Sequence, residues 1–148
     1  MCHAGSESAS KSRGPGVTHS PMSLADHSLP KKARMAAAIL GAAGVALGAF
    51  GAHALKATLE ASGRTDTWET AVFYHLVHAL ALLVLSTQPS MRRSTFYCFV
   101  VGVAVFSGSL YLLCLSGLNW LGAITPIGGI CLIAGWLSCL LPTPKAQA

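Results

Sequence analysis

Two histidines, His75 and His78, are the strongest candidates for a chemical or binding role in this 148-residue sequence. They are three residues apart and so share one face of a helix. The segment around them, Thr70–Met91, contains no Asp, Glu, Lys or Arg. A neutral imidazole has one donor and one acceptor, so each ring needs hydrogen-bond partners. The pair could bind a ligand, pass a proton, ligate a metal or bond to neighbouring helices.

Two later apolar segments carry hydroxyl side chains at the depth that the histidines reach. At 1.5 Å per residue, the histidines lie about 7 and 12 Å from the start of their segment, and the hydroxyls lie about 6–12 Å from the same side of the membrane. Pro126 is expected to interrupt the last helix and free the carbonyl of Gly122 as a further acceptor. We therefore predict a polar layer in the outer half of the membrane. Its members are His75, His78, Ser107, Ser109, Tyr111 and Thr125.

We favour interhelical hydrogen bonding as the role of this layer, at about 0.6 kcal/mol for each bond. The alternative is a ligand, ion or proton site, because ionisable groups within membranes are commonly functional. Metal ligation is a third interpretation, but no acidic or thiol partner has a suitable spacing. The sequence predicts no catalytic residue, no metal site and no cofactor. The cysteines of the apolar segments are interpreted as small packing residues, and His53 as a residue of the membrane interface outside the layer.

Four apolar segments must position these side chains. Each is free of Asp, Glu, Lys and Arg over about 20 residues, the length needed to span a bilayer. The composition agrees, because only 10% of the residues are charged, against about 25% in soluble domains. We predict an all-α integral membrane protein, an antiparallel bundle of four transmembrane helices in a membrane domain of residues 35–141. The expected helices are about 35–55, 70–87, 95–115 and 120–141.

The charged residues lie outside these segments and indicate the orientation. Eight Lys and Arg residues lie before the first segment, between the second and third, or after the fourth, and only Lys56 and Arg64 lie on the other side. This asymmetry places both termini in the cytoplasm, with Trp68 and Trp120 as anchors at the outer interface. Residues 1–34 are predicted to be a disordered cytoplasmic tail, whose composition would also suit a start at Met22 or Met35. Residues 142–148 are predicted to be a second, short cytoplasmic tail.

A strip of glycines marks the first segment. They are spaced three, four and three residues apart and therefore lie on one side of a helix. In a membrane such a strip lets another helix approach closely, whereas in a soluble helix each glycine would cost about 1 kcal/mol relative to alanine. We predict a helix-packing seam formed by Gly41, Gly44, Gly48 and Gly51.

Four blocks of sequence resemble one small family of membrane proteins. They are GAFGAHALK (48–56), WETAVFYHLVHALALL (68–83), FSGSLYLL (106–113) and LGAITPIGGICLIAGW (121–136). Together they resemble the YgdD/YwdK-type small inner-membrane protein family (domain of unknown function 423; transmembrane protein 256-like) from Met35 to Leu141. The resemblance implies an inner-membrane location, no established biochemical activity, and no catalytic residues to assign.

These observations predict a multi-pass inner-membrane protein with a structural or accessory role, not an enzyme. A small transporter or ligand- or proton-binding subunit that uses the polar layer is the alternative, although no Asp, Glu, Lys or Arg lies within the spans to form an ion path. The expected partners are the lipid bilayer and either further copies of the chain or a larger membrane complex. Nucleic acid is not expected, because the net charge of +5 comes from residues at helix ends.

Overall fold

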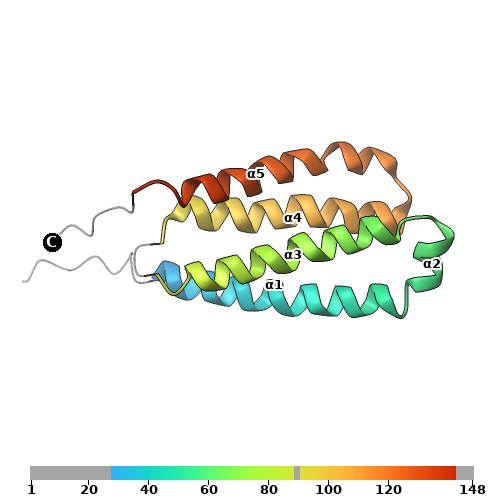
Figure 1. Ribbon diagram of the computed structural model, residues 1–148, viewed down its shortest axis with the longest axis horizontal. Coiled ribbons are helices and arrows are strands. Elements are labelled where there is room, and N and C mark those ends of the chain that lie inside the picture. Colours follow the sequence, from blue (N-terminus) through green and yellow to red (C-terminus); the bar gives the residue numbers. More distant parts are fainter. Residues whose placement is uncertain (1–27, 89–90, 143–148) are drawn as a thin grey trace, which may run out of the picture.

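The computed structural model describes residues 28–88 and 91–142, which form four long helices and two short ones. The long helices are α1 (Ser28–Ala52), α3 (Thr65–Leu85), α4 (Arg93–Ser116) and α5 (Thr125–Ser138); α2 (Lys56–Ala61) and a 3-10 turn (Asn119–Ala123) lie in the connections. Figure 1 shows the long helices running side by side, with α2 and the link from α4 to α5 at one end.

Four stretches are long and apolar enough to cross a membrane, and the fourth runs through the 3-10 turn as Asn119–Ser138. Successive spans are antiparallel, because short connections join them. The described residues contain no strand. The prediction of an all-α, four-span membrane protein is therefore confirmed.

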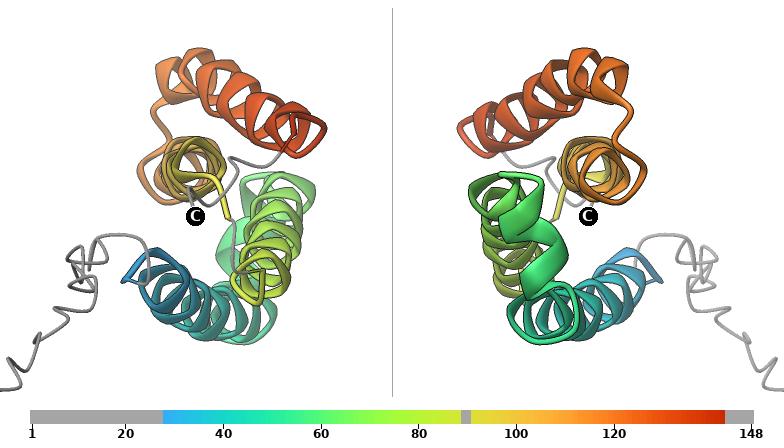
Figure 2. Two further views of the ribbon diagram at one scale, coloured as in Figure 1. Left: turned by 90° about the vertical axis from the view of Figure 1, so that its left-hand side faces the viewer. Right: turned by 90° about the vertical axis from the view of Figure 1, so that its right-hand side faces the viewer.

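The helices follow a simple order in space. α1 packs against α3, α3 against α4, and α4 against α5, whereas α1 barely touches α4 (Figure 2). The molecule is thus built from two helix pairs, α1–α3 and α4–α5, joined through α3 and α4. A turn with a left-handed residue, Gly117, ends α4, and another, Gly63, joins α2 to α3. Glycine adopts this conformation without the steric cost that other residues meet.

Helix α1 begins at Ser28, seven residues before the predicted start at Met35. Pro30 lies in its first turn, where a missing backbone N–H costs no helical hydrogen bond, and the buried residues Leu29 and Ala33 fix that turn against the bundle. The predicted disordered tail therefore overlaps a helix at residues 28–34. Its remainder, residues 1–27, and the last residues, 143–148, lie outside the described residues.

Helix α3 begins at Thr65, five residues before the predicted start at Thr70. Asp66 and Glu69 lie in its first turns, where negative charge is favourable near the positive end of the helix. The predicted start at Thr70 was based on apolar residues, which mark only the part of a helix that lies in lipid. The charged first turns of α3 were therefore not included.

The fourth span differs from its prediction. It is not a single helix kinked at Pro126 but a 3-10 turn followed by α5, and Pro126 lies in the first turn of α5. Proline is well tolerated there because no intrahelical donor is lost. The predicted interruption inside a helix, and with it the carbonyl of Gly122 freed by a kink, is therefore wrong.

The interior of the bundle holds two groups of buried apolar residues. The group nearer the α2 end comprises Leu59, Trp68, Ala71, Tyr111 and Cys114. The other comprises Ala33, Ala37, Leu82, Phe99, Val103 and Leu132. The large side chains on the outside of the helices are apolar as well, which suits contact with lipid. Helix α3 buries its predicted histidine face and exposes Phe73, Val77, Leu80 and Val84 on the opposite side.

Candidate functional site

The six residues of the predicted polar layer all point into the bundle. Five are buried and Thr125 is half-buried. They come from α3, α4 and α5, as the sequence predicted. The structure does not gather them into one cluster, however. Instead it divides five of them into separate hydrogen-bonded groups, each of which joins two helices, and leaves Ser107 outside these groups.

His78 is held at both ring nitrogens. Nδ1 lies 2.7 Å from the backbone carbonyl of Tyr74, and Nε2 lies 3.0 Å from the indole Nε1 of Trp136 on α5. A carbonyl only accepts and an indole N–H only donates, so Nδ1 carries the hydrogen and Nε2 accepts. The ring is thus a neutral imidazole with both hydrogen-bonding positions filled. It has no free position for a ligand or a proton.

Trp136 is the partner that the sequence analysis missed. The sequence predicts hydroxyl groups around both histidines, at a depth measured from a helix start at Thr70. Because α3 starts at Thr65, His78 lies thirteen residues, or about 20 Å, along that helix. At this position it meets the later part of α5, beyond Thr125. An indole N–H in an apolar segment needs an acceptor, and this requirement was the signal available in the sequence.

His75 has weaker contacts. Its Nδ1 lies 3.4 Å from the hydroxyl of Tyr111 on α4, a long distance for a hydrogen bond. Its Nε2 is buried without a hydrogen-bond partner within the described chain, although the backbone of Leu40 on α1 lies near enough to interact with the ring. The structure therefore brings His75 and Tyr111 together as predicted, but as the loosest group of the layer.

Trp68 lies beside this group and corrects a second expectation. It is only 2% exposed, its ring centroid is 4.8 Å from that of Tyr111, and its Nε1 donates to the carbonyl of Leu47 on α1 at 3.2 Å. It is a core residue and not the interfacial anchor predicted. Trp120, at 60% exposure, remains available for that role, and His53 is exposed in the turn after α1, outside the layer.

The serine and threonine hydroxyls of the layer differ in whether they have hydrogen-bond partners. Ser109 and Thr125 are 2.8 Å apart across α4 and α5, and Ser109 also donates to the carbonyl of Phe106 at 3.0 Å. Thr125 Oγ1 in turn lies 3.4 Å from the carbonyl of Leu121, so either hydroxyl can be the donor between Ser109 and Thr125. Ser107 is buried, and its hydroxyl has no partner among the described residues. Ser107 is therefore in the interior but not joined to the layer.

A further hydroxyl pair, absent from the sequence prediction, closes the opposite end of the same helices. The Oγ1 atom of Thr95 and the Oγ atom of Ser138 are 2.6 Å apart and buried. Both residues stand at the ends of apolar segments, where a hydroxyl gives no signal of its own. Only the pairing of α4 with α5 places them together.

The glycine seam of α1 packs against α3 of the same chain. A Cβ atom at Gly44 would lie 2.6 Å from the Leu76 side chain, and one at Gly51 would collide with the indole of Trp68. At Gly48 it would meet Val72 at 3.2 Å. At Gly41 it would meet nothing within 4 Å, so Gly41 is not part of the contact.

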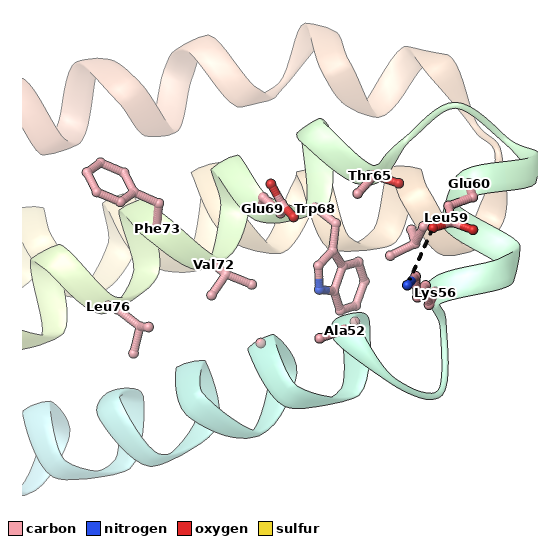
Figure 3. Close-up of a pocket in the computed structure, with 12 residues that line it drawn as sticks. Ala52, Lys56, Leu59, Glu60, Thr65, Trp68, Glu69, Val72, Phe73 and Leu76 are labelled. Atoms are coloured by element: carbon pink, nitrogen blue, oxygen red, sulfur yellow. Dashed lines mark ion pairs between the residues drawn. The ribbon is translucent and has the colours of Figure 1, made fainter.

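The same helices leave a groove that the sequence analysis did not predict. It has a volume of about 630 Å³ and lies between α1 and α3, with α2 across its end. Figure 3 shows Val72 and Leu76 extending from α3 toward α1, and the Lys56–Glu60 ion pair on α2. The groove thus has apolar walls and a charged rim that also includes Glu69. No group of three His, Cys, Asp or Glu that could hold a metal occurs among the described residues.

The known proteins to which this chain is similar are membrane proteins of unknown function. A family described as "Protein of unknown function (DUF423)" matches residues 47–129. A UPF0382 membrane protein of Staphylococcus haemolyticus is 42% identical over 106 residues, which is 68% of this chain and 85% of the relative. The UPF0382 membrane protein YwdK of Bacillus subtilis is 39% identical over 108 residues, 68% of this chain and 86% of its own.

The UPF0382 inner membrane protein YgdD of Escherichia coli is 40% identical over 110 residues, covering 71% of this chain and 83% of the relative. No solved structure matches the chain. The resemblance inferred from the sequence blocks is therefore confirmed. This multi-pass membrane protein, with its four spanning helices, belongs to the DUF423 family.

Proposed function

We propose that this protein is a structural or accessory component of the inner membrane and has no catalytic activity of its own. The observation that carries the proposal is that both nitrogens of His78 are occupied by other parts of the bundle, Tyr74 and Trp136. A histidine used in this way bonds helices to one another. The hydroxyl pairs of α4 and α5 do the same, and bonds of this kind stabilise a membrane bundle by about 0.6 kcal/mol each.

The role of His78 can be tested with two substitutions. His78→Gln keeps a donor and an acceptor, so the variant is expected to accumulate in the membrane and to complement a deletion strain. His78→Leu leaves the indole N–H of Trp136 without an acceptor, so its membrane abundance is expected to fall. Quantitative immunoblotting of membranes beside complementation separates the two effects. An abundant Gln variant that fails to complement would contradict the proposal, because it would show that the imidazole itself is required.

The proposed orientation places both termini in the cytoplasm. Among the described residues, Lys31, Lys32, Arg34, Arg92 and Arg93 lie at one end of the bundle, and Lys56 and Arg64 lie at the other. Short loops rich in Lys and Arg stay on the cytoplasmic side, so α2 is assigned to the outer face. The name of the Escherichia coli relative supports the inner membrane as the location.

Cysteine labelling tests this orientation. In a cysteine-free background, Ala61→Cys on α2 is expected to react with a membrane-impermeant thiol reagent added to intact cells. Ser94→Cys, at the start of α4, is expected to react only after the membrane is opened; both positions are exposed. The reverse pattern would contradict the orientation.

The lipid bilayer is the proposed partner of the apolar outer surface. A second copy or a larger complex would contact the lipid-facing side chains and not Gly44 or Gly51, because α3 already covers these two glycines. The seam therefore supports folding of the single chain.

A further inference from the structure

We propose that the groove between α1 and α3 binds one phospholipid whose headgroup carries both a phosphate and a primary ammonium, as in phosphatidylethanolamine. The inference deepens the proposed accessory role, and it takes from the proposed orientation that the lipid comes from the outer leaflet. The groove, the ion pair at its rim and the apolar residues of its walls are all visible in Figure 3.

The groove has the polarity gradient of a lipid and room for a headgroup and the beginning of its acyl chains. Its volume of about 630 Å³ lies within the range of about 300–1,000 Å³ common for small-molecule sites. Its charged end is at α2, and its apolar end is formed by Val72 and Leu76 opposite Gly48. From Glu69 to Leu76 the groove follows α3 for about 10 Å, from the expected interface toward the membrane interior. An amphiphile inserted in a bilayer has its polar and apolar parts in the same order as the groove.

The absence of a side chain at Gly48 keeps the apolar end open. A Cβ atom there would already lie 3.2 Å from Val72, so any larger residue would fill the space. At Gly51, by contrast, the indole of Trp68 occupies the space that a side chain would take. Trp68 thus closes the wall of the groove at Gly51, whereas at Gly48 the nearest atom is a methyl group of Val72.

The charges at the rim select the headgroup. Lys56 and Glu60 are 4.0 Å apart, with 67% and 59% of their side chains exposed, and exposed pairs of this kind contribute little to stability. Both charges therefore remain available to a ligand. Lys56 can bind a phosphate, while the carboxylates of Glu60 and Glu69 can accept hydrogen bonds from a primary ammonium.

Other common headgroups fit this rim less well. The quaternary ammonium of choline has no N–H to donate to the carboxylates. A phosphoglycerol headgroup brings negative charge and no positive charge toward two carboxylates and a single lysine. The arrangement of one cation and two anions therefore favours an aminophospholipid over both.

The rim is held in position by the surrounding structure. Leu59 buries the inner side of α2. Arg64, directly before α3, donates to the carbonyl of Leu113 and, at 2.9 Å, to the side-chain oxygen of Asn119. These contacts fix the segment between α1 and α3 onto the end of α4. A site whose parts are already in place loses less free energy to ordering when it binds.

Headgroup selection can be measured by native mass spectrometry of the purified full-length chain in mild detergent, mixed with equal amounts of dioleoyl phosphatidylethanolamine, phosphatidylcholine and phosphatidylglycerol. The wild type is expected to retain phosphatidylethanolamine at least about threefold over the other two. Glu69→Gln and Glu60→Gln are expected to remove this preference. Asp66→Asn, an exposed carboxylate of the same helix turn that does not line the groove, is the matched control and is expected to keep it.

A second pair of variants tests the shape of the groove. Ala52→Phe, at the exposed end of α1 inside the groove, is expected to reduce retention of all three lipids, whereas Ala57→Phe on α2, outside the lining, is expected to leave retention unchanged. Circular dichroism melts of every variant confirm that the bundle is intact.

Equal retention of the three lipids by the wild type, a preference for phosphatidylglycerol, or equal behaviour of Glu69→Gln and Asp66→Asn would overturn the proposal. None of these outcomes would affect the results for His78. A reversed orientation would move the groove to the inner leaflet without removing its headgroup preference in detergent. Failure of the lipid site and failure of the proposed function are therefore distinguishable.

Discussion

The helix pairs α4–α5 and α1–α3 both place glycine at their interface, yet the glycines face different parts of the opposite helix. In α4–α5, a Cβ atom at Gly128 would collide with the backbone of Phe106, and one at Gly135 would lie 2.5 Å from the ring of Phe99. At Gly128 backbone meets backbone, at Gly135 a ring fills the space, and the hydroxyls of Thr95 and Ser138 are bonded in the same interface. The two helices therefore form one close-packed unit.

In α1–α3 the contacting glycines face side chains alone, and none of them meets the backbone of α3. Gly44 faces the branched end of Leu76 and Gly48 faces Val72, and beyond these contacts the two helices leave the groove. A side chain can move to another rotamer, whereas a backbone cannot. A row of glycines therefore does not by itself determine how closely two helices pack. The atoms opposite each glycine decide whether the interface is closed or leaves room for a ligand.

The largest expected effect comes from Gly128→Ala. The added methyl group would meet the Phe106 backbone, so α4 and α5 must separate, and we expect a loss of about 3 kcal/mol in stability. Gly129→Ala is the matched control, because its Cβ atom would lie 3.7 Å from the Phe106 ring, an ordinary contact. Thermal unfolding in detergent, followed by circular dichroism, measures both. Similar melting temperatures for the two variants would show that α4 and α5 are not in backbone contact.

A smaller effect is expected in the α1–α3 pair. Gly44→Leu would press against Leu76, a side chain that can partly yield, so we expect a loss of about 2 kcal/mol. Gly41→Leu is expected to be tolerated, since nothing lies within 4 Å of a Cβ atom at that position. The same unfolding assay compares them. Equal losses at positions 41 and 44 would indicate that the whole predicted seam faces α3, contrary to the structure.

The features that could be predicted from the sequence are those that depend on one segment at a time. Four apolar runs gave the four spans, and the alternation of polar and apolar residues along α3 gave the buried face of His75 and His78. The role of Gly44 was also predicted, because the glycine spacing is a property of α1 alone. Such signals are local and do not require knowledge of the neighbouring helix.

The features that were missed depend on how two helices are aligned. The bond between His78 and Trp136 requires α3 to meet α5 at one particular height, and an error of five residues in the start of α3 was enough to hide it. The contact of Gly128 with Phe106 likewise depends on the alignment of α4 with α5. The groove at Gly48 is space left between helices, which no pattern within a single helix can indicate.

The smallest expected effect concerns the hydroxyl pair that closes the far end of α4–α5. Ser138 donates to the carbonyl of Gly135 at 2.6 Å, so its single hydrogen is used and Thr95 must be the donor between the two residues. Either single substitution already breaks the interhelical bond, so the double variant loses no further bond between the helices. A double-mutant cycle with Thr95→Val and Ser138→Ala is therefore expected to give a coupling energy of about 0.6 kcal/mol.

The control cycle combines Thr95→Val with Ser116→Ala, whose exposed hydroxyl donates to the carbonyl of Leu112 within its own helix. Because these two residues lie at opposite ends of α4, their effects on stability are expected to add. A coupling energy near zero for Thr95 and Ser138 would mean that their bond does not join the helices. In that case the closed packing of α4–α5 would rest on its glycines alone, and the polar pairs would not contribute to the difference between the two halves of the molecule.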